Sequence, residues 1–295
     1  MATTTLSSMG DAVAAEIVSA QILEAARAAV VCVPMCATDT VSGSNVKSYP
    51  RFVKVTATQA TVGTDETTTE MTDSQVSVTL GEYAIGVALA DALEVGSSVL
   101  DVALKIAVEL GKGYADKHDI DALALASSLT DSVGSTGQLS NEDLLLQAIY
   151  ECDANNIGGR QLAGILYPKQ VHQLRQSLSG AYENKSAIYS RTDILSGIAP
   201  SKPNGFAFNI FGLDIFMSMN VVAANSSADS LGMICTVGPD SPIMRAVGLL
   251  NGAAWDGRKE IQRDASLRAT ELWVTGYVGY GVIAPERGCG YLSVR

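Results

Sequence analysis

The chain has 295 residues and a mass of 30.8 kDa, enough for one large domain or two ordinary ones with a sizeable core. Apolar residues make up 47% of it and charged residues 17%, a balance that excludes a disordered chain. The net charge of −11 argues against a protein that binds by neutralising phosphates or anionic lipids. The aromatic content of only 6% favours a building block over an enzyme with an aromatic-lined pocket.

The charge is unevenly distributed along the chain. Residues 1–150 contain 19 acidic and seven basic side chains, whereas residues 151–295 contain 12 acidic and 13 basic ones. This asymmetry suits head-to-tail association of identical chains, in which the acidic part of one copy meets the less acidic part of the next. A solvated acidic face that keeps the protein soluble explains the same counts equally well.

Targeting signals and cysteines favour a cytoplasmic origin. Residues 1–10 lack the basic start and apolar run of a secretory signal, and the apolar stretch over residues 25–36 is too short for a membrane span. We therefore expect synthesis in a cytoplasm and no transmembrane helix. The cysteines lack the paired spacing of a zinc site and are expected to be core thiols: Cys32, Cys36, Cys152, Cys235 and Cys289.

The first expected element is an amphipathic helix over residues 8–30. Its apolar positions recur at helical spacing, and Asp11 lies in its first turn. The apolar stripe is narrow and rich in alanine, which suits contact with a second subunit better than formation of a core. Pro34 ends the pattern.

Two segments of strict apolar alternation, residues 51–57 and 75–80, predict a pair of strands. The polar stretch between them has almost nothing to bury, so the pair is expected to form an extended hairpin whose tip leaves its own domain. The hairpin has a basic stem and an acidic tip. The stem carries Lys47, Arg51 and Lys54, and the tip carries Asp65, Glu66, Glu70 and Asp73.

From residue 97 or 98 the apolar period becomes helical for about thirty residues, which predicts one long helix. The expected apolar stripe includes Leu110, Tyr114, Lys117 and Ile120. The residues expected on the wet face include Asp116 and Asp119.

The region from residue 140 to about residue 242 alternates helices and strands, which predicts a mixed α/β subdomain. Ser140 is the expected N-cap of a helix over residues 144–155. A short buried strand, a helix with proline in its first turn, and a hairpin or bulged strand are expected next, over residues 163–167, 168–178 and 207–219. From Ile243 onward the pattern is strand-rich, so we expect the chain to end in a sheet.

No motif indicates catalysis or nucleotide binding. The only Gly-Lys pair, Gly111-Lys112, is followed by glycine where a P-loop requires Ser or Thr. Residues 116–121 (DKHDID) point in several directions on one helix and are expected to form a solvated face rather than a metal site. His172 is expected at an ordinary surface position. We therefore expect no catalytic residue, no cofactor and no metal.

The order of these parts resembles the tailed-phage major capsid proteins of the Hong Kong 97-like fold. Residues 261–291 (IQRDASLRATELWVTGYVGYGVIAPERGCGY) look like the closing strands of such shell proteins. The resemblance covers nearly the whole chain and implies an α+β fold with an N-arm, an extended E-loop hairpin, a peripheral domain with a long spine helix and a mixed α/β axial domain. The implied boundaries are an N-arm over 1–45, an E-loop over 46–80, a peripheral domain over 81–139 and 250–295, and an axial domain over 140–249.

The resemblance implies a structural protein, not an enzyme, that assembles into hexamers and pentamers of an icosahedral shell around the double-stranded DNA of a tailed bacteriophage. The implied location is the virion, with synthesis in the host cytoplasm and no membrane partner. The implied partners are other copies of the chain, a portal, packaged DNA at the inner surface and, where one is used, a decoration protein. Some members fuse a scaffolding segment before the arm; about 45 residues precede the E-loop here, so a separate scaffolding protein is expected. Some members crosslink an E-loop lysine to a late asparagine, but no asparagine follows Asn251, so no covalent crosslinking is expected.

Other classes of protein stay open. An encapsulin nanocompartment shares the fold and encloses enzymes instead of a genome. A flagellin-like filament suits the composition, but such proteins end in helices. A small-molecule enzyme would require a deep pocket in a monomer.

The segregated charge of the hairpin provides candidate contacts between copies. An E-loop lies on the neighbouring subunit in such shells, so the acidic tip is expected to dock near basic residues of another copy. Exposed ion pairs contribute only about 0–1 kcal/mol each, so an ordinary charged surface explains these residues equally well. The candidate contact residues are Lys47, Arg51, Lys54, Asp65, Glu66, Glu70, Asp73, Arg258, Lys259, Arg263 and Arg268.

Overall fold

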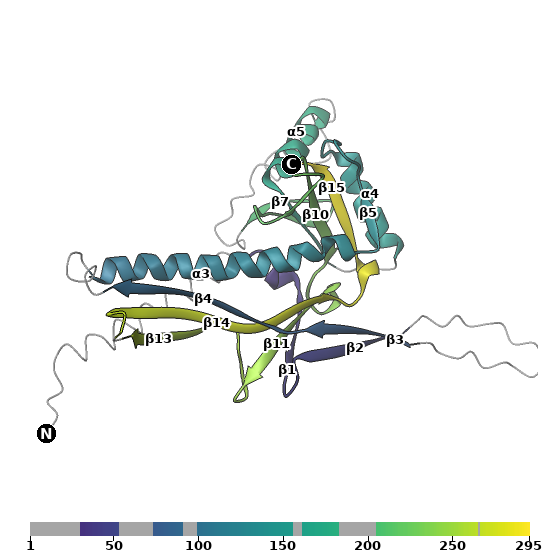
Figure 1. The fold of residues 1–295 in the computed structure, drawn as a ribbon. Coiled ribbons are helices and arrows are strands. Elements are labelled where there is room, and N and C mark those ends of the chain that lie inside the picture. The colour runs from purple at the N-terminus through teal and green to yellow at the C-terminus, as the bar shows by residue number, and fades with distance from the viewer. Residues whose placement is uncertain (1–29, 53–72, 91–98, 156–160, 183–204, 265) are drawn as a thin grey trace, which may run out of the picture.

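A computed structural model describes residues 30–52, 73–90, 99–155, 161–182, 205–264 and 266–295. Figure 1 shows a wedge-shaped upper part above an elongated lower part, with the long helix α3 (Val99–Ala124) between them. The expected helix over residues 8–30 lies outside the described residues except for its last position. Lys54, Asp65, Glu66 and Glu70 of the hairpin also lie outside them.

The lower part is a six-stranded sheet organised by one long strand. Its strands are β1 (Ala37–Val41), β4 (Gly81–Ala90), β11 (Ile243–Leu250), β12 (Ala253–Ala254), β13 (Arg258–Asp264) and β14 (Ala269–Val282). β14 pairs antiparallel with β4, β11 and β13, and β1 pairs parallel with β11. α3 covers one face of this sheet, where Leu110 and Tyr114 pack against Leu272 and Val274.

The upper part is a seven-stranded sheet. Its strands are β5 (Asp131–Val133), β6 (Leu162–Leu166), β7 (Phe206–Ile210), β8 (Leu213–Met217), β9 (Val222–Ala224), β10 (Asp229–Thr236) and β15 (Gly288–Val294). The strand order is β5-β15-β10-β6-β8-β7, with β9 beside β10. The two helices α4 (Glu142–Ala154) and α5 (Pro168–Tyr182) share one core with this sheet, around Leu145, Leu174 and Phe208. A second core joins the sheet to the last turns of α3 and to the chain near Cys32.

Short 3-10 helices connect the two parts. They are η1 (Val33–Met35), η2 (Leu125–Ser128), η3 (Gly238–Asp240) and η4 (Pro285–Arg287). η2 continues directly from α3, and η4 lies between β14 and β15, so the chain passes from the lower to the upper sheet at these points.

A two-stranded ribbon projects from the lower part (Figure 1). It consists of β2 (Val46–Phe52) and β3 (Asp73–Thr79), paired antiparallel from Val46 with Thr79 to Phe52 with Asp73. An antiparallel pair of strands is therefore present, but β2 begins at Val46 rather than at residue 51, and residues 53–57 of the expected first strand lie outside the described residues. Its sequence VKSYPRF lacks clean apolar alternation because pairing with β3, rather than burial of one face, holds it.

The long helix is confirmed, but the prediction of its wet face is wrong at two positions. His118 and Asp119 are only 2% and 1% exposed, whereas Ile120, placed on the apolar stripe, is 44% exposed, and Lys117 is exposed as well. The cause is that the second half of α3 lies between the two sheets, with Tyr114 in the core of one and Leu123 in the core of the other. A single apolar stripe cannot describe a helix that is buried on two sides.

The elements expected after residue 140 are present with one shifted cap. β6 is buried at all five positions, α5 begins at Pro168, and β7 and β8 form a hairpin with a register shift near Phe208. The N-cap of α4 is Asn141 and not Ser140: the Asn141 side chain accepts a hydrogen bond from the Leu144 amide at 2.9 Å. Ser140 instead pairs its hydroxyl with that of Tyr291 at 2.7 Å.

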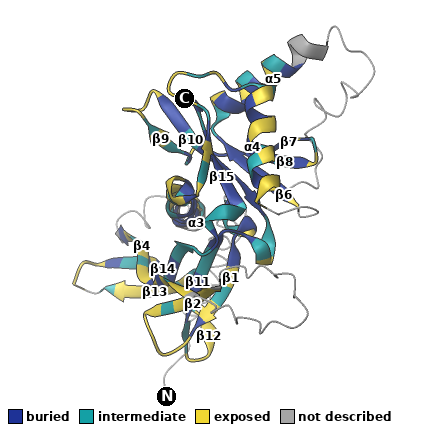
Figure 2. Cartoon of the chain, turned by 90° about the vertical axis from the view of Figure 1, so that its right-hand side faces the viewer, coloured by how far each residue is buried: buried dark blue, intermediate teal, exposed yellow. Residues whose placement is uncertain are grey.

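The two sheets do not follow simple blocks of sequence. β11 precedes residue 250 and lies in the six-stranded sheet, whereas β15 follows it and lies in the seven-stranded sheet beside β10 and β5. The domain boundaries implied by the resemblance stay a prediction. Figure 2 shows that the strands of the upper sheet are mostly buried, while β13 and the ribbon are mostly exposed.

Candidate subunit interface and the polar junction behind it

The base of the ribbon crosses β14 at two glycines. A Cβ atom on Gly279 would lie 2.3 Å from the carbonyl oxygen of Thr79, and one on Gly281 would lie 2.6 Å from a methyl group of Val78. Ordinary side chains do not fit at either position, so the backbones of β3 and β14 can approach closely. The contact is completed by a small core of Val41, Val78, Leu80 and Ala246. The direction in which the ribbon leaves the body is therefore set by packing at its base.

Two of the basic stem residues are engaged within their own chain. Lys47 pairs with Asp39 at 2.5 Å and donates a hydrogen bond to the carbonyl of Thr40 at 3.1 Å. The hydrogen bond from Lys47 lowers the pKa of the Asp39 carboxyl. Arg51 pairs with Glu286 of η4 at 2.6 Å. These exposed pairs steady the ribbon against β1 and η4, each by about 0–1 kcal/mol.

The basic candidates of the second half gather on β13. Arg258, Lys259 and Arg263 lie on this edge strand, and Arg268 lies in the turn that leads to β14, at a φ of 48°. Side chains alternate between the two faces of a strand, so Arg258 shares a face with Glu260 and not with the other two. Arg258 pairs with Glu260 at 3.4 Å.

The ribbon and β13 lie at opposite ends of the lower part (Figure 1). Of the four acidic tip residues, only Asp73 lies within the described part of the chain, where it is the first residue of β3. Asp73 therefore lies at the opposite end of the lower part from the basic candidates of β13, whereas Asp65, Glu66 and Glu70 lie outside the described residues.

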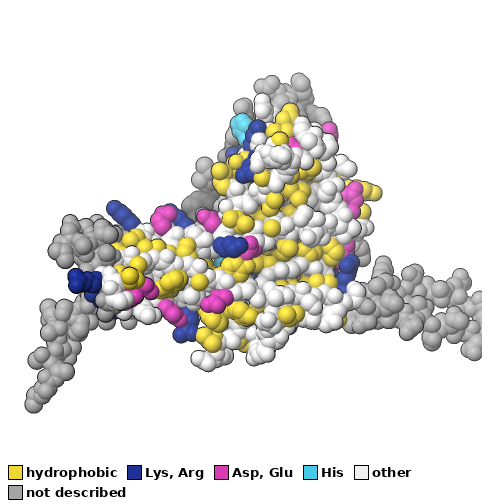
Figure 3. Space-filling view, in the orientation of Figure 1, with side chains coloured by type: hydrophobic (Ala, Val, Ile, Leu, Met, Phe, Trp, Pro, Cys, Tyr) yellow, Lys and Arg dark blue, Asp and Glu magenta, His cyan; other side chains and the backbone are white. Residues whose placement is uncertain are grey.

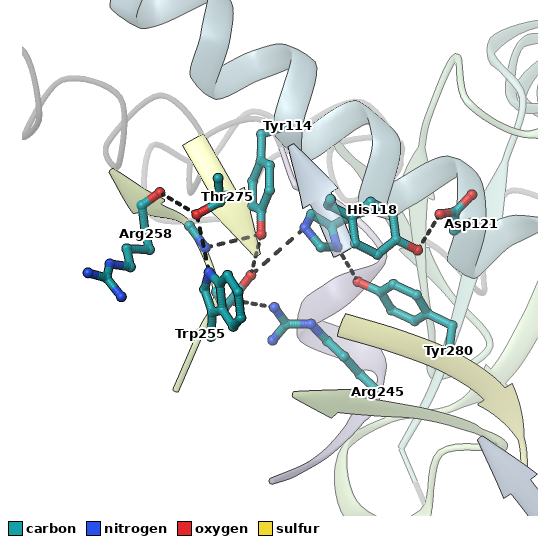
Figure 4. Close-up of polar contacts among 11 residues, drawn as sticks. Tyr114, His118, Asp121, Arg245, Trp255, Arg258, Thr275 and Tyr280 are labelled. Atoms are coloured by element: carbon teal, nitrogen blue, oxygen red, sulfur yellow. Dashed lines mark hydrogen bonds and ion pairs between the residues drawn. The ribbon is translucent and has the colours of Figure 1, made fainter. Parts of the chain in front are cut away.

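A buried polar junction joins α3 to the lower sheet (Figure 4). Tyr114 donates a hydrogen bond to Asp256 at 2.9 Å, and the imidazole Nδ1 of His118 lies 2.8 Å from the Tyr280 hydroxyl. Arg245 of β11 forms an ion pair with the same Asp256. The buried His118 Nε2 atom has no hydrogen-bond partner among the described residues and lies 3.8 Å from Asp256.

The titrating groups of this junction have shifted pKa values. Burial lowers the pKa of His118 to about 4, although the nearby Asp256 acts in the opposite direction. Burial alone would raise the pKa of Asp256, but the charge and hydrogen bond of Arg245, with the hydrogen bond from Tyr114, together outweigh it, and the net pKa is lowered. Burial also raises the pKa of Tyr114 and Tyr280. At neutral pH the junction thus holds one Arg-Asp ion pair and a neutral imidazole, an arrangement that stabilises the helix-sheet contact.

Asp119 links the other side of α3 to the chain near Val31. Its carboxylate accepts hydrogen bonds from the backbone amides of Val31 and Cys32, at 3.0 and 2.8 Å. Burial raises the pKa of this carboxyl, against the effect of those two bonds. Asp119 therefore attaches the beginning of the described chain to the middle of the molecule.

The five cysteines are buried and free, as predicted. Cys32, Cys36 and Cys235 lie in the core between α3 and the upper sheet, and Cys152 and Cys289 lie in the core under α4. Burial raises the pKa of Cys152 and Cys289 to about 12, so these two thiols stay protonated at neutral pH. The exposed position of His172 is also confirmed.

Two other kinds of site are absent from the described part of the chain. Within the described ranges no helix has the length and apolar character needed to cross a membrane. No group of three or more His, Cys, Asp or Glu residues with the geometry of a metal site occurs among the residues that the structure places.

Sequence patterns missed the polar junction for an identifiable reason. Tyr114 and His118 are four residues apart and share one helix face, which the apolar stripe could have included by stepping from Tyr114 to His118 instead of Lys117. Their partners come from distant segments: the register of β11 against β14 places Arg245 opposite Tyr280, and Asp256 lies in the short segment between β12 and β13.

Comparison with known proteins identifies the architecture. No protein-family model and no curated protein sequence matches the chain. The structure is similar to the capsid of the cyanophage P-SCSP1u, with a TM-score of 0.65 and 15% identity over 91% of this chain and 89% of that chain. The capsid of Ralstonia phage GP4 gives a TM-score of 0.65 and 12% identity over 91% and 90% of the two chains. The chain has a phage capsid fold.

The structure is also similar to that of a protein that is not from a phage. The holo-SrpI encapsulin complex from Synechococcus elongatus PCC 7942 gives a TM-score of 0.60 and 10% identity over 88% of this chain and 85% of that chain. The α+β capsid fold implied by the order of elements is thereby confirmed.

Proposed function

We propose that the chain is the major capsid protein of a tailed bacteriophage and assembles into hexamers and pentamers of an icosahedral shell around double-stranded DNA. The observation that carries this proposal is the capsid fold, which spans 91% of this chain and 89% of the cyanophage capsid chain. The projecting ribbon supports it, because an exposed two-stranded element with a fixed base is suited to reach a neighbouring copy. The exposed edge strand β13 offers a surface at the other end.

In this proposal the chain is a structural component of the virion and not an enzyme. Its partners are other copies of itself, the portal and the packaged DNA. The net charge of −11 limits DNA contact at the inner surface to a few local basic residues.

A second candidate function is the shell of an encapsulin-type nanocompartment, which the similarity to the SrpI encapsulin favours. The two functions differ in what the shell encloses, a genome or a cargo protein, and not in the fold of the subunit.

The decisive experiment is negative-stain electron microscopy of the expressed full-length chain. Closed shells or shell fragments are the expected result, and a monomer under all assembly conditions would contradict both functions. Particles from the natural source are then treated with nuclease and opened. Protected double-stranded DNA supports the phage capsid, and a co-purified enzyme supports the nanocompartment.

We also propose that the acidic ribbon tip docks on the β13 end of another copy. The four acidic residues would face the four basic ones: Asp65, Glu66, Glu70 and Asp73 against Arg258, Lys259, Arg263 and Arg268. The separation of the ribbon and β13 within one chain supports a contact between copies. Reversal of Glu66 and Glu70 to lysine should lower the yield of particles, and additional reversal of Arg258 and Arg268 to glutamate should restore it. Unchanged yield in the first variant would contradict this contact.

A further inference from the structure

The outer surfaces of α4 and α5 have opposite charge. Both helices pack on the same face of the upper sheet and share its core, through Leu145 and Cys152 of α4 and Val171 and Leu174 of α5. The 13 residues of α4 include four acidic side chains and no basic one. The 15 residues of α5 include Lys169, His172 and Arg175 and no acidic side chain.

The exposed face of α4 is apolar in its centre and acidic at both ends. Asp143, Leu146, Tyr150 and Asp153 are all exposed and follow one another at helical spacing. Leu146 is 41% exposed and Tyr150 is 66% exposed. A large aromatic and a leucine side by side between two carboxylates form the arrangement typical of an interface core with a charged rim.

The exposed face of α5 is basic and partly fixed in place. Lys169, His172 and Arg175 are exposed and three residues apart. Arg175 donates a hydrogen bond to the carbonyl of Ala207 at 3.1 Å, and its guanidinium lies 5.3 Å from the centre of the Phe208 ring. Because the Arg175 side chain is already held by its own chain, it loses little conformational entropy when a partner binds.

The opposite charges lie on different flanks of the wedge. Figure 3 shows basic side chains on one side of the upper part and acidic side chains along the opposite side. An isologous contact of α4 with α4 would bring like charges together, whereas a head-to-tail contact brings opposite charges together. A head-to-tail contact repeated around an axis generates a ring.

We infer that the outer face of α4 docks on the outer face of α5 in the next copy of the chain. Asp143 and Asp153 then face Lys169 and His172, and Leu146 and Tyr150 become buried. This inference rests on the proposed shell function, and it assigns one contact within a ring of subunits.

Charge reversal with rescue tests this contact in the full-length chain. The first variant carries Asp143→Lys and Asp153→Lys, the second carries Lys169→Glu and His172→Glu, and the third combines all four. Arg175 is kept because it also contacts Ala207 and Phe208. We expect each double variant to lower the yield of rings and particles by about tenfold or more, and the combined variant to recover most of it.

Two further variants separate assembly from folding. Tyr150→Ala should lower particle yield without changing the thermal unfolding of the isolated subunit, because its side chain is largely exposed. The control variant carries Glu82→Lys and Glu109→Lys, which gives the same change in net charge on exposed positions of β4 and α3. It should assemble as the wild type does.

The outcomes distinguish this inference from the proposed function. If the wild type forms no particles, the proposed function fails. If the wild type forms particles and the α4 variants form them equally well, only the α4-α5 contact is wrong. If those variants assemble normally but lose an enclosed protein or DNA, the face of α4 binds that cargo instead, and the inference is likewise overturned.

Discussion

The upper and lower sheets differ in how completely one chain covers them. The seven-stranded sheet is covered on both faces, by α4 and α5 on one and by the end of α3 and η1 on the other, and Phe208, Ile215 and Tyr291 are fully buried in it. Among the described residues, α3 covers one face of the outer half of the six-stranded sheet, and no other helix packs on it. Trp273 on β14 and Ile261 on β13 are 38% and 39% exposed there.

The two sheets therefore differ in how far the folding of one chain covers their apolar side chains. The chain itself buries most apolar side chains of the upper sheet, so their packing stabilises the monomer. The lower sheet exposes apolar side chains on an edge strand, a feature that unassembled proteins normally avoid. Substitutions in the core of the upper sheet should therefore act on monomer stability, whereas substitutions of the exposed apolar residues of the lower sheet should act on assembly.

The largest effect is expected from a pair of aromatic truncations. Phe208→Ala should lower the free energy of unfolding by about 3–5 kcal/mol, because it leaves a cavity in a sealed core. Trp273→Ala should cost about 1 kcal/mol or less in the isolated subunit, because that ring is partly solvated. Urea denaturation of both variants measures the difference, and equal losses would remove the distinction between the two sheets.

A pH effect of up to roughly 3 kcal/mol is expected at the junction beneath α3. The folded state holds His118 neutral with a pKa of about 4. As the pH falls below about 6.5, the unfolded chain binds a proton that the folded chain does not, so stability decreases until about pH 4. Asp256 and Arg245 also face this imidazole, so the measured quantity is the difference between the wild type and His118→Gln. The exposed His172→Gln is the matched control, and it should retain the pH dependence of the wild type.

An intermediate effect is expected where the ribbon crosses β14. Gly279→Ala should destabilise the chain by about 1–3 kcal/mol, because its Cβ would lie 2.3 Å from the Thr79 carbonyl oxygen. Gly81→Ala is a close control, since a Cβ there meets nothing within 4 Å. If Gly279→Ala assembles into particles of wild-type size at wild-type yield, the crossing does not set the direction of the ribbon.

The smallest effect is expected from the ion pair between the ribbon and η4. Arg51 and Glu286 are 42% and 34% exposed, so a double-mutant cycle with alanine should give a coupling energy of about 1 kcal/mol or less. The coupling should weaken further as salt is added. A coupling that is unchanged at high salt would mean that the pair is less solvated than the structure indicates.

Apolar spacing predicted the elements that pack against a single neighbouring surface. The length of α3 and the strands at the end of the chain followed from spacing alone. Spacing failed where a second surface intervenes. His118 and Asp119 carry polar side chains that a stripe excludes, yet both are buried because α3 is enclosed by two sheets and each has a hydrogen-bond partner.

The contact candidates show a different limit of the sequence. Segregated charge drew attention to Lys47 and Arg51, but charge alone does not specify a partner, and these two pair with Asp39 and Glu286 of the same chain. The opposite charges of α4 and α5 are visible in the sequence as well. Their meaning required the knowledge that both helices lie on one face of one sheet, which depends on strand order and not on local pattern.

The position of β15 has a consequence for how the subunit is made. This strand lies inside the upper sheet, between β5 and β10, and contributes the buried Tyr291 to its core. Both of its neighbours are synthesised earlier, so the sheet cannot close until residues 288–294 have left the ribosome. Strand pairing across such sequence distances is slow, and the upper sheet exposes apolar surface until β15 has paired with its neighbours. The core beneath α4 and α5 is therefore completed only after β15 has been synthesised. An incomplete chain lacks the folded upper part that could contact a neighbouring copy.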